Sequence, residues 1–198
     1  MFSFNAYGDC YGEYLLDTSD NFQKAIKVCT PSAESGDLRS QDILGFIFYK
    51  NENYKESLKW TKIAADKGFA PAQLRLGLMY ETGKGVLIDY VTAVKWYRKS
   101  AEQGNVSAQN NMGLMYELGN GVLKNYKVSA SWYKKAADAG SATAQMNLGI
   151  YYCYGSGVEK DLSKSKNLLN TAYESGQLSP GQKNFVEGIW ERCELANY

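Results

Sequence analysis

The stretches LGLMYETGKGV (76–86) and MGLMYELGNGV (112–122) are nearly identical and lie 36 residues apart. A third copy, LGIYYCYGSGV (148–158), follows after another 36 residues. Similarity that returns at a fixed period of this size is the sequence signature of a repeat protein. Each copy has a glycine within an apolar run and ends in G-x-G. The motif could either bind a phosphate or turn the chain between two repeated elements.

Glycines that close successive units set the length of the repeat. Their spacings are 32, 36, 36 and 36 residues, and they are Gly36, Gly68, Gly104, Gly140 and Gly176. We therefore expect full repeats at 69–104, 105–140 and 141–176. The unit at 37–68 is a shorter repeat that lacks four residues at its corner.

Each full unit is predicted to form two helices. Apolar and small residues recur at helical spacing over 70–81 and again over 89–103. Asp89 is placed to cap the second helix, and Gly104 to end it in the left-handed conformation. A glycine returns inside the first helix at Gly45, Gly77, Gly113 and Gly149. Because such a glycine costs about 1 kcal/mol relative to alanine, its return predicts that another helix approaches closely, aided by small Ala or Ser at 57, 93, 129 and 165.

The pattern A-x-x-x-L-G-x-x-Y-x-x-G-x-G-V, followed by A-x-x-W-Y-x-K-A-A-x-x-G, resembles the Sel-one-like repeat (SLR), a relative of the tetratricopeptide repeat. The unit at 105–140 carries the resemblance at Ala108, Gly113, Tyr116, Gly119, Gly121, Val122, Ser129, Trp132, Tyr133, Lys135, Ala136, Ala137 and Gly140. The resemblance covers about residues 37–176, with Ser129 in place of Ala and Leu168 in place of Trp. It implies an all-α fold, a right-handed α-solenoid of stacked antiparallel helix hairpins (an α/α superhelix) that binds other proteins and has no single activity.

The two ends of the chain are predicted to be degenerate units of the same repeat array. We expect one solenoid domain over 1–198, with a degenerate helical hairpin at 1–36 and a capping helix at 177–198. In the first of these, residues 6–17 would pair with 21–35, although Pro31 should bend or restart the second helix. In the cap, Phe185, Ile189 and Trp190 would pack inward while polar residues face the solvent.

Four cysteines lie near the ends: Cys10, Cys29, Cys153 and Cys193. They lack C-x-x-C spacing, which argues against a zinc site. Cys10 would lie across the N-terminal hairpin from Cys29. The cap helix with Cys193 should stack beside the helix with Cys153, and Cys153 is at a position expected to be polar and exposed. Two interpretations stay open: one disulfide at each end, or four free, partly buried thiols. Disulfides would place the protein outside the reducing cytosol.

Charge and hydropathy exclude several kinds of partner. The net charge is +1, from 22 basic and 21 acidic residues, and no run of Lys or Arg appears. This argues against nucleic acid or an anionic membrane as the partner. The longest strongly apolar stretch, 43–49, is too short to span a bilayer. No signal peptide is visible, so we expect a periplasmic or secreted protein if a leader was removed, and otherwise a cytoplasmic one.

The sequence offers little for catalysis. It has no histidine, which removes the commonest general base and metal ligand. Dinucleotide and Walker loops need a strand before their glycines, whereas a predicted helix precedes Gly83. Asp89, Asn125 and Asp161 share one repeat position, which favours helix caps over acid catalysts. We therefore expect no enzyme activity, no cofactor and no metal.

The working surface is predicted from the first helices, which line the concave side of such a superhelix. Residues at i and i+4 share a helix face. On this basis the groove residues are Arg39, Ile43, Ile47, Arg75, Met79, Asn111, Met115, Asn147 and Tyr151. Their mixture of apolar and hydrogen-bonding groups suits a protein or peptide. The alternative is that Met79 and Met115, identical between units, simply pack between neighbouring helices.

Three classes of function remain for such a chain. The first is an interaction scaffold or adaptor, such as those of bacterial envelope or secretion processes, which would bind an effector, a receptor or an envelope component. The second is an immunity or inhibitor protein that occludes a secreted toxin or lipase effector. The third is an enzyme. We favour the scaffold, with another protein as partner, no nucleic acid and no membrane insertion.

Overall fold

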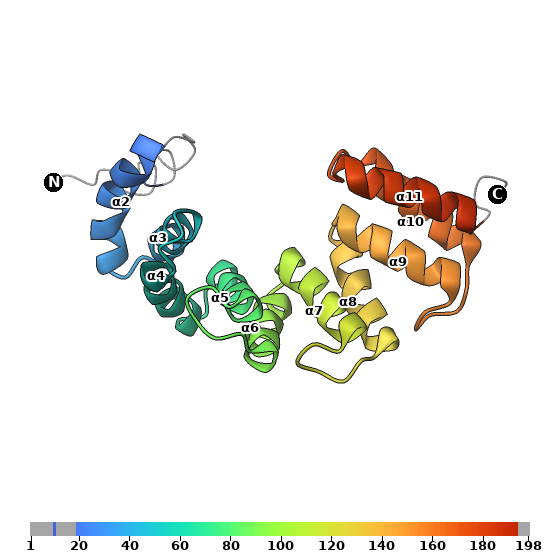
Figure 1. Ribbon diagram of the computed structural model, residues 1–198, viewed down its shortest axis with the longest axis horizontal. Helices are drawn as coiled ribbons and strands as arrows, with labels where there is room; N and C mark the ends of the chain where they lie inside the picture. The colour runs from blue at the N-terminus through green and yellow to red at the C-terminus, as the bar shows by residue number, and fades with distance from the viewer. Residues whose placement is uncertain (1–9, 11–18, 194–198) are drawn as a thin grey trace. The chain divides into compact units, whose positions relative to one another are not determined.

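The computed structural model describes Cys10 and residues 19–193, and these form helices joined by turns and loops (Figure 1). No strand occurs among these residues, and the predicted all-α fold is confirmed. The chain divides into two compact units, Met1–Gln103 and Gly104–Tyr198. A single domain over 1–198 stays a prediction.

The described part of the first unit contains two helix hairpins and the helix that precedes them. Its helices are α2 (Ser19–Glu34), α3 (Leu38–Lys50), α4 (Tyr54–Asp66), α5 (Ala70–Thr82) and α6 (Tyr90–Glu102). The hairpins α3–α4 and α5–α6 stack through α4 and α5, and α2 packs on α3 (Figure 1). Helix α2 runs through Pro31 without restarting there, and a bend, the other expected outcome, stays a prediction. The helix predicted at 6–17 lies outside the described residues, apart from Cys10.

The second unit repeats this plan and ends in a cap. Its helices are α7 (Val106–Leu118), α8 (Tyr126–Asp138), α9 (Ala142–Tyr154), α10 (Leu162–Glu174) and α11 (Pro180–Arg192). Hairpins α7–α8 and α9–α10 stack through α8 and α9, and α11 packs on α10. Helix α11 begins with a capping box between Ser179 and Gln182. Val186 and Ile189 are its buried residues, whereas Phe185 is exposed, so the prediction that Phe185 packs inward is wrong.

Polar side chains cap almost every helix and fix where it begins. At each such start a side-chain oxygen accepts a hydrogen bond from the backbone N–H three residues later; the residues are Asp37, Asn53, Asp89, Asn105, Asn125, Ser141, Asp161 and Ser179. Each cap stabilises its helix by about 0.5–2 kcal/mol relative to alanine. The interpretation of Asp89, Asn125 and Asp161 as caps is confirmed.

The glycine inside each first helix lets the second helix approach, as predicted. A Cβ atom at Gly77 would lie 2.6 Å from the ring of Tyr97. The small residue on the second helix adds a hydrogen bond that the sequence did not reveal. Its hydroxyl donates to the glycine carbonyl at 2.7–2.8 Å in the pairs Ser57–Gly45, Ser129–Gly113 and Ser165–Gly149.

The G-x-G motif is a corner of the fold. Gly83 and Gly85 have φ values of 72° and 77°, in the left-handed region that glycine adopts most easily. A Cβ atom at Gly85 would lie 2.8 Å from the backbone oxygen of Tyr54, at the start of the preceding α4. Gly157 lies in the same way against the backbone of Tyr126, at the start of α8. The glycines thus turn the chain where it touches the previous repeat.

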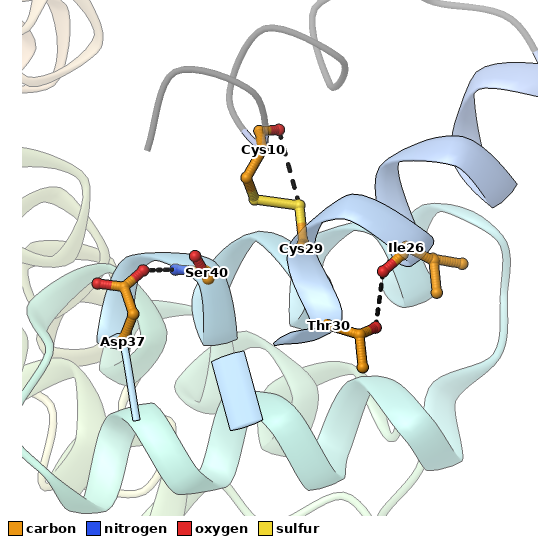
Figure 2. Close-up of a disulfide and its surroundings, with 6 residues drawn as sticks. All are labelled: Cys10, Ile26, Cys29, Thr30, Asp37 and Ser40. Atoms are coloured by element: carbon orange, nitrogen blue, oxygen red, sulfur yellow. Dashed lines mark hydrogen bonds between the residues drawn. A yellow bond between two sulfur atoms is a disulfide. The ribbon is translucent and has the colours of Figure 1, made fainter. Parts of the chain in front are cut away.

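Each unit contains a disulfide bond. Cys10 is bonded to Cys29 of α2, with Cα atoms 4.9 Å apart (Figure 2). Figure 2 also shows Asp37, which accepts a hydrogen bond from the Ser40 N–H at the start of α3. Cys153 of α9 is bonded to Cys193, with Cα atoms 6.0 Å apart. These are the pairs named from the sequence. The predicted exposure of Cys153 is wrong, because its side chain is buried.

Candidate protein-binding surfaces

Most of the predicted groove residues do not reach the surface. Ile43, Ile47, Met79, Met115 and Tyr151 are buried, so their assignment to an exposed groove is wrong. The reason is the helical period. Two turns take about 7.2 residues, so a face that starts at Pro71 continues at Leu78, whereas Met79 has turned toward the core. The two methionines pack between helices, which was the alternative interpretation.

Helices α3 and α5, which carry several of the predicted groove residues, are linked by an ion pair. Arg39 is exposed, and the Arg75 guanidinium lies 3.1 Å from the Asp42 carboxylate. Only 16% and 13% of these two side chains are exposed. The Arg75 guanidinium also lies 4.6 Å from the centroid of the Phe46 ring. Burial raises the pKa of Asp42 above its usual value even though Arg75 acts in the opposite direction. The cluster is therefore held firmly, with little of it open to a ligand.

The corresponding positions of the second unit are neutral. Asn111 of α7 and Asn147 of α9 are half-buried and occupy the place of Arg75. Asn110 of α7 and Met146 of α9 occupy the repeat position of Asp42 in α3 and Leu74 in α5. No ion pair like Asp42–Arg75 can therefore form in the second unit. The first-helix face thus differs in chemistry from one unit to the other.

Three exposed aliphatic side chains lie close together at the corner of the α5–α6 hairpin. Leu87 is 90% exposed, Ile88 58% and Val91 52%, and we call these three residues the apolar tip. The α7–α8 corner keeps one of them, Leu123, and has Lys124 and Lys127 beside it. The α9–α10 corner has Glu159, Lys160 and Ser163 at these positions. The tip was not predicted from the sequence, although charged residues occupy four of the six corresponding positions at the other two corners.

A pocket opens on the second unit between α8, α9 and α10. It has a volume of about 280 Å³ and is lined by Lys134, Asp138, Leu148, Tyr152, Lys164, Asn167 and Leu168. A second hollow of about 460 Å³ shares Tyr152 and Lys164 with it and continues over Val158, Glu159, Lys160 and Asp161. We call the first of these the α10 pocket. It combines an apolar floor, Leu148 and Leu168, with charged side chains at its rim.

Two tyrosine–glutamate hydrogen bonds join the helices of their hairpins. The Tyr133 hydroxyl donates to the Glu117 carboxylate at 2.6 Å, and the Tyr97 hydroxyl donates to Glu81 in the same way. Burial, together with the neighbouring Glu117 carboxylate, raises the pKa of Tyr133 far above its usual value, so this phenol stays protonated. Across the described residues, no three Cys, Asp or Glu side chains gather as potential metal ligands. None of the described helices has the length and apolarity that a membrane crossing requires.

Comparison with known families assigns the repeats. The family model of the Sel1 repeat matches four segments, residues 45–69, 70–105, 106–141 and 142–177. The chain belongs to the Sel1 repeat family. Sel1 repeat proteins are typically scaffolds for protein–protein interactions and are generally not catalysts. Among curated proteins, none matches this chain.

Solved structures of other Sel1 repeat proteins share the fold. A protective antigen present in uropathogenic Escherichia coli strains, which displays an SLR fold, is 33% identical, with a TM-score of 0.78 over 84% of this chain and 36% of that one. A Sel1 repeat protein from Oxalobacter formigenes is 32% identical, with a TM-score of 0.73 over 85% and 68%. One from Klebsiella pneumoniae subsp. pneumoniae has the same fold at 18% identity, with a TM-score of 0.60 over 96% and 93%. This Sel1 repeat chain thus spans about a third of the first protein's length.

Proposed function

We propose that this chain is a non-catalytic scaffold that binds a partner protein through the apolar tip of its first unit. The observation that carries the proposal is the exposure of Leu87, Ile88 and Val91 at one hairpin corner. Single apolar side chains are common on protein surfaces, whereas adjacent ones often mark an interaction site. Each square ångström of apolar surface that a partner covers contributes about 25 cal/mol.

The accessible residues of the predicted groove remain candidate secondary contacts. Arg39 is exposed on α3, and Asn111 and Asn147 are half-buried on α7 and α9. Their side chains offer hydrogen bonds and one charge, which give a contact direction and specificity more than affinity. Arg75 is already engaged by Asp42 and the Phe46 ring, so it would serve a partner mainly through the shape of its surface.

The experiment is capture of the partner with the tagged chain, followed by hydrogen–deuterium exchange on the purified complex. We expect the partner to protect backbone amides in residues 83–92, around the apolar tip. The corner at 119–128 is the internal control, because Leu123 is as exposed as Leu87 but has lysines beside it. Protection confined to other parts of the chain would reject the tip as the contact surface.

A second candidate function is an inhibitor that occludes a secreted toxin or lipase effector. The observation that favours it is the pair of disulfide bonds, one in each unit, which suits work outside the reducing cytosol. In this case we also expect a periplasmic or secreted location. The assay is the activity of the captured partner with and without this chain. Unaltered activity would reject the inhibitor function and would be consistent with the scaffold function.

A further inference from the structure

The two units contain the same apolar cradle, and in the first unit an indole ring fills it. Trp96 of α6 packs with Tyr80 against a cluster formed by Ala64, Ala65, Ala72 and Leu76 of α4 and α5. Lys99 lies over the indole, with its Nζ atom 4.3 Å from the ring centroid. Lys62 and Asp66 form an ion pair on the same helix as the two alanines.

In the second unit the cradle is preserved but the indole is missing. Ala136, Ala137, Ala144 and Leu148 form the same cluster 72 residues later, again with a tyrosine, Tyr152, packed against it. The Lys62–Asp66 ion pair returns as Lys134–Asp138, at 2.8 Å. Leu168 stands at the place of Trp96, and Thr171 at the place of Lys99. At the edge of the cluster, Ala130 and Ser141 replace Leu58 and Phe69. The α10 pocket, of about 280 Å³, lies where this cradle meets the smaller side chain.

We propose that the α10 pocket binds an indole ring, and that its natural occupant is a tryptophan side chain of the partner protein. The second half of this proposal rests on the proposed scaffold function. A tryptophan supplied by a partner would take the position that Trp96 holds within the first unit. Large aromatic side chains seated in a partner's pocket are the residues that dominate the energy of many protein interfaces.

The electrostatics of the rim suit an aromatic ring better than an aliphatic side chain. The faces of aromatic rings carry partial negative charge and attract cations. Lys164 already lies 5.4 Å from the centroid of the Tyr152 ring, and Lys134 of α8 also lines the pocket. Both ammonium groups have a carboxylate neighbour, Asp161 and Asp138, so an uncharged ligand adds no unpaired charge.

The shape beside the pocket leaves room for the chain that bears the tryptophan. The hollow of about 460 Å³ adjoins the pocket at Tyr152 and Lys164 and is lined by polar side chains and Val158. A peptide backbone needs hydrogen-bond partners when it leaves water, and Glu159, Lys160 and Asp161 supply such groups. An indole in the pocket and its backbone in the hollow would therefore both meet suitable surroundings.

The test uses N-acetyl-L-tryptophanamide as a probe and isotope-labelled full chain observed by NMR. We expect saturable shifts of the amides of Lys134, Asp138 and Asn167 in the wild type. Leu168→Trp fills the pocket with the chain's own indole and should weaken probe binding by roughly tenfold or more, as expected for losing the burial of one aromatic ring. Leu168→Phe serves the same purpose should the larger side chain perturb folding.

The first unit provides a gain-of-site control. Trp96→Leu should open a matching pocket and produce a second set of shifts at Lys62 and Asp66. Shifts that persist in Leu168→Trp, or equal shifts with N-acetyl-L-leucinamide, would overturn the indole site. Because the probe needs no partner, a failure of the pocket is separate from a failure of the scaffold function. A captured partner whose interface tryptophans can all be replaced by alanine without loss of affinity would overturn the second half alone.

Discussion

The α5–α6 and α9–α10 hairpins have the same backbone plan but are held together by different chemistry. In the first, the Tyr97 hydroxyl of α6 donates to the Glu81 carboxylate of α5. In the second, Cys153 and Leu169 replace these two residues, and Cys153 is instead bonded to Cys193 beyond α11. Carboxylate and phenol change together, so neither group is left buried without a partner, which would be costly. The repeat pattern therefore sets the backbone, and departures from it show where a hairpin has a special role.

The largest expected effect comes from breaking the link that is special to the second hairpin. Cys153→Ser with Cys193→Ser should lower the free energy of unfolding by about 2–4 kcal/mol, because the bond closes a 40-residue separation. Urea denaturation measures the loss, and a reductant should lower the stability of the wild type by more than that of the variant, which keeps the Cys10–Cys29 bond. Thiol titration of denatured, unreduced wild type should find no free thiol among the four cysteines; four would contradict the bonds.

The next effect tests the close contact that both hairpins share. In Gly77→Ala, the new Cβ atom would lie 2.6 Å from the Tyr97 ring, and overpacking of this kind costs about 1–3 kcal/mol. Gly181→Ala in α11 is the matched control, because no atom lies within 4 Å of its Cβ position. That control should gain up to about 1 kcal/mol from helix propensity. Equal thermal shifts for the two variants would refute the proposed role of Gly77.

A smaller effect is expected from the hydrogen bond that only the first hairpin has. Tyr97→Phe removes the donor to Glu81 and should cost about 1–2 kcal/mol, since the carboxylate is partly buried. A double-mutant cycle with Glu81→Gln isolates the coupling between the two side chains. Additive losses would show that the pair does not stabilise the hairpin.

The repeats also differ in their pH response, through Asp42 on α3. Burial raises the pKa of Asp42 in the folded chain above its unfolded value. The folded state therefore binds this proton more tightly, and the contribution of Asp42 to stability falls as the pH rises through the acidic range. Unfolding of the wild type and of Asp42→Asn, compared over that range, should show the wild type losing stability relative to the variant. A difference that is constant with pH would contradict this.

The sequence predicted the helices because the repeat signals each element several times. Caps such as Asp89, corner glycines such as Gly85 and the buried Gly77 each have one structural reason, and each recurs. A glutamine near the start of each first helix also recurs. Its side-chain amide donates to a carbonyl at the end of the preceding helix in Gln41–Ala33, Gln73–Ala65 and Gln145–Ala137. The recurring glutamine could have predicted this hydrogen bond between repeats, but the bond was not predicted.

The candidate surfaces were harder to predict, for a geometric reason. The groove was placed by counting in steps of four, which drifts away from one helix face after two steps, so Met79 was chosen where Leu78 lies on the outer side. The same one-residue error exchanged Phe185 for Val186. Exposure at a corner, as for Leu87, depends on what the neighbouring repeat leaves uncovered. That information is absent from periodicity.

The measurement that tests the scaffold function most directly is the affinity of the captured partner for two tip variants. Leu87→Glu with Ile88→Glu should weaken binding by roughly a hundredfold, because about 3 kcal/mol of apolar burial is lost and two charges enter the interface. Leu123→Glu, at an equally exposed position of the next corner, should leave the dissociation constant within about twofold. Equal affinities for wild type and the Leu87→Glu, Ile88→Glu variant would contradict binding through the apolar tip.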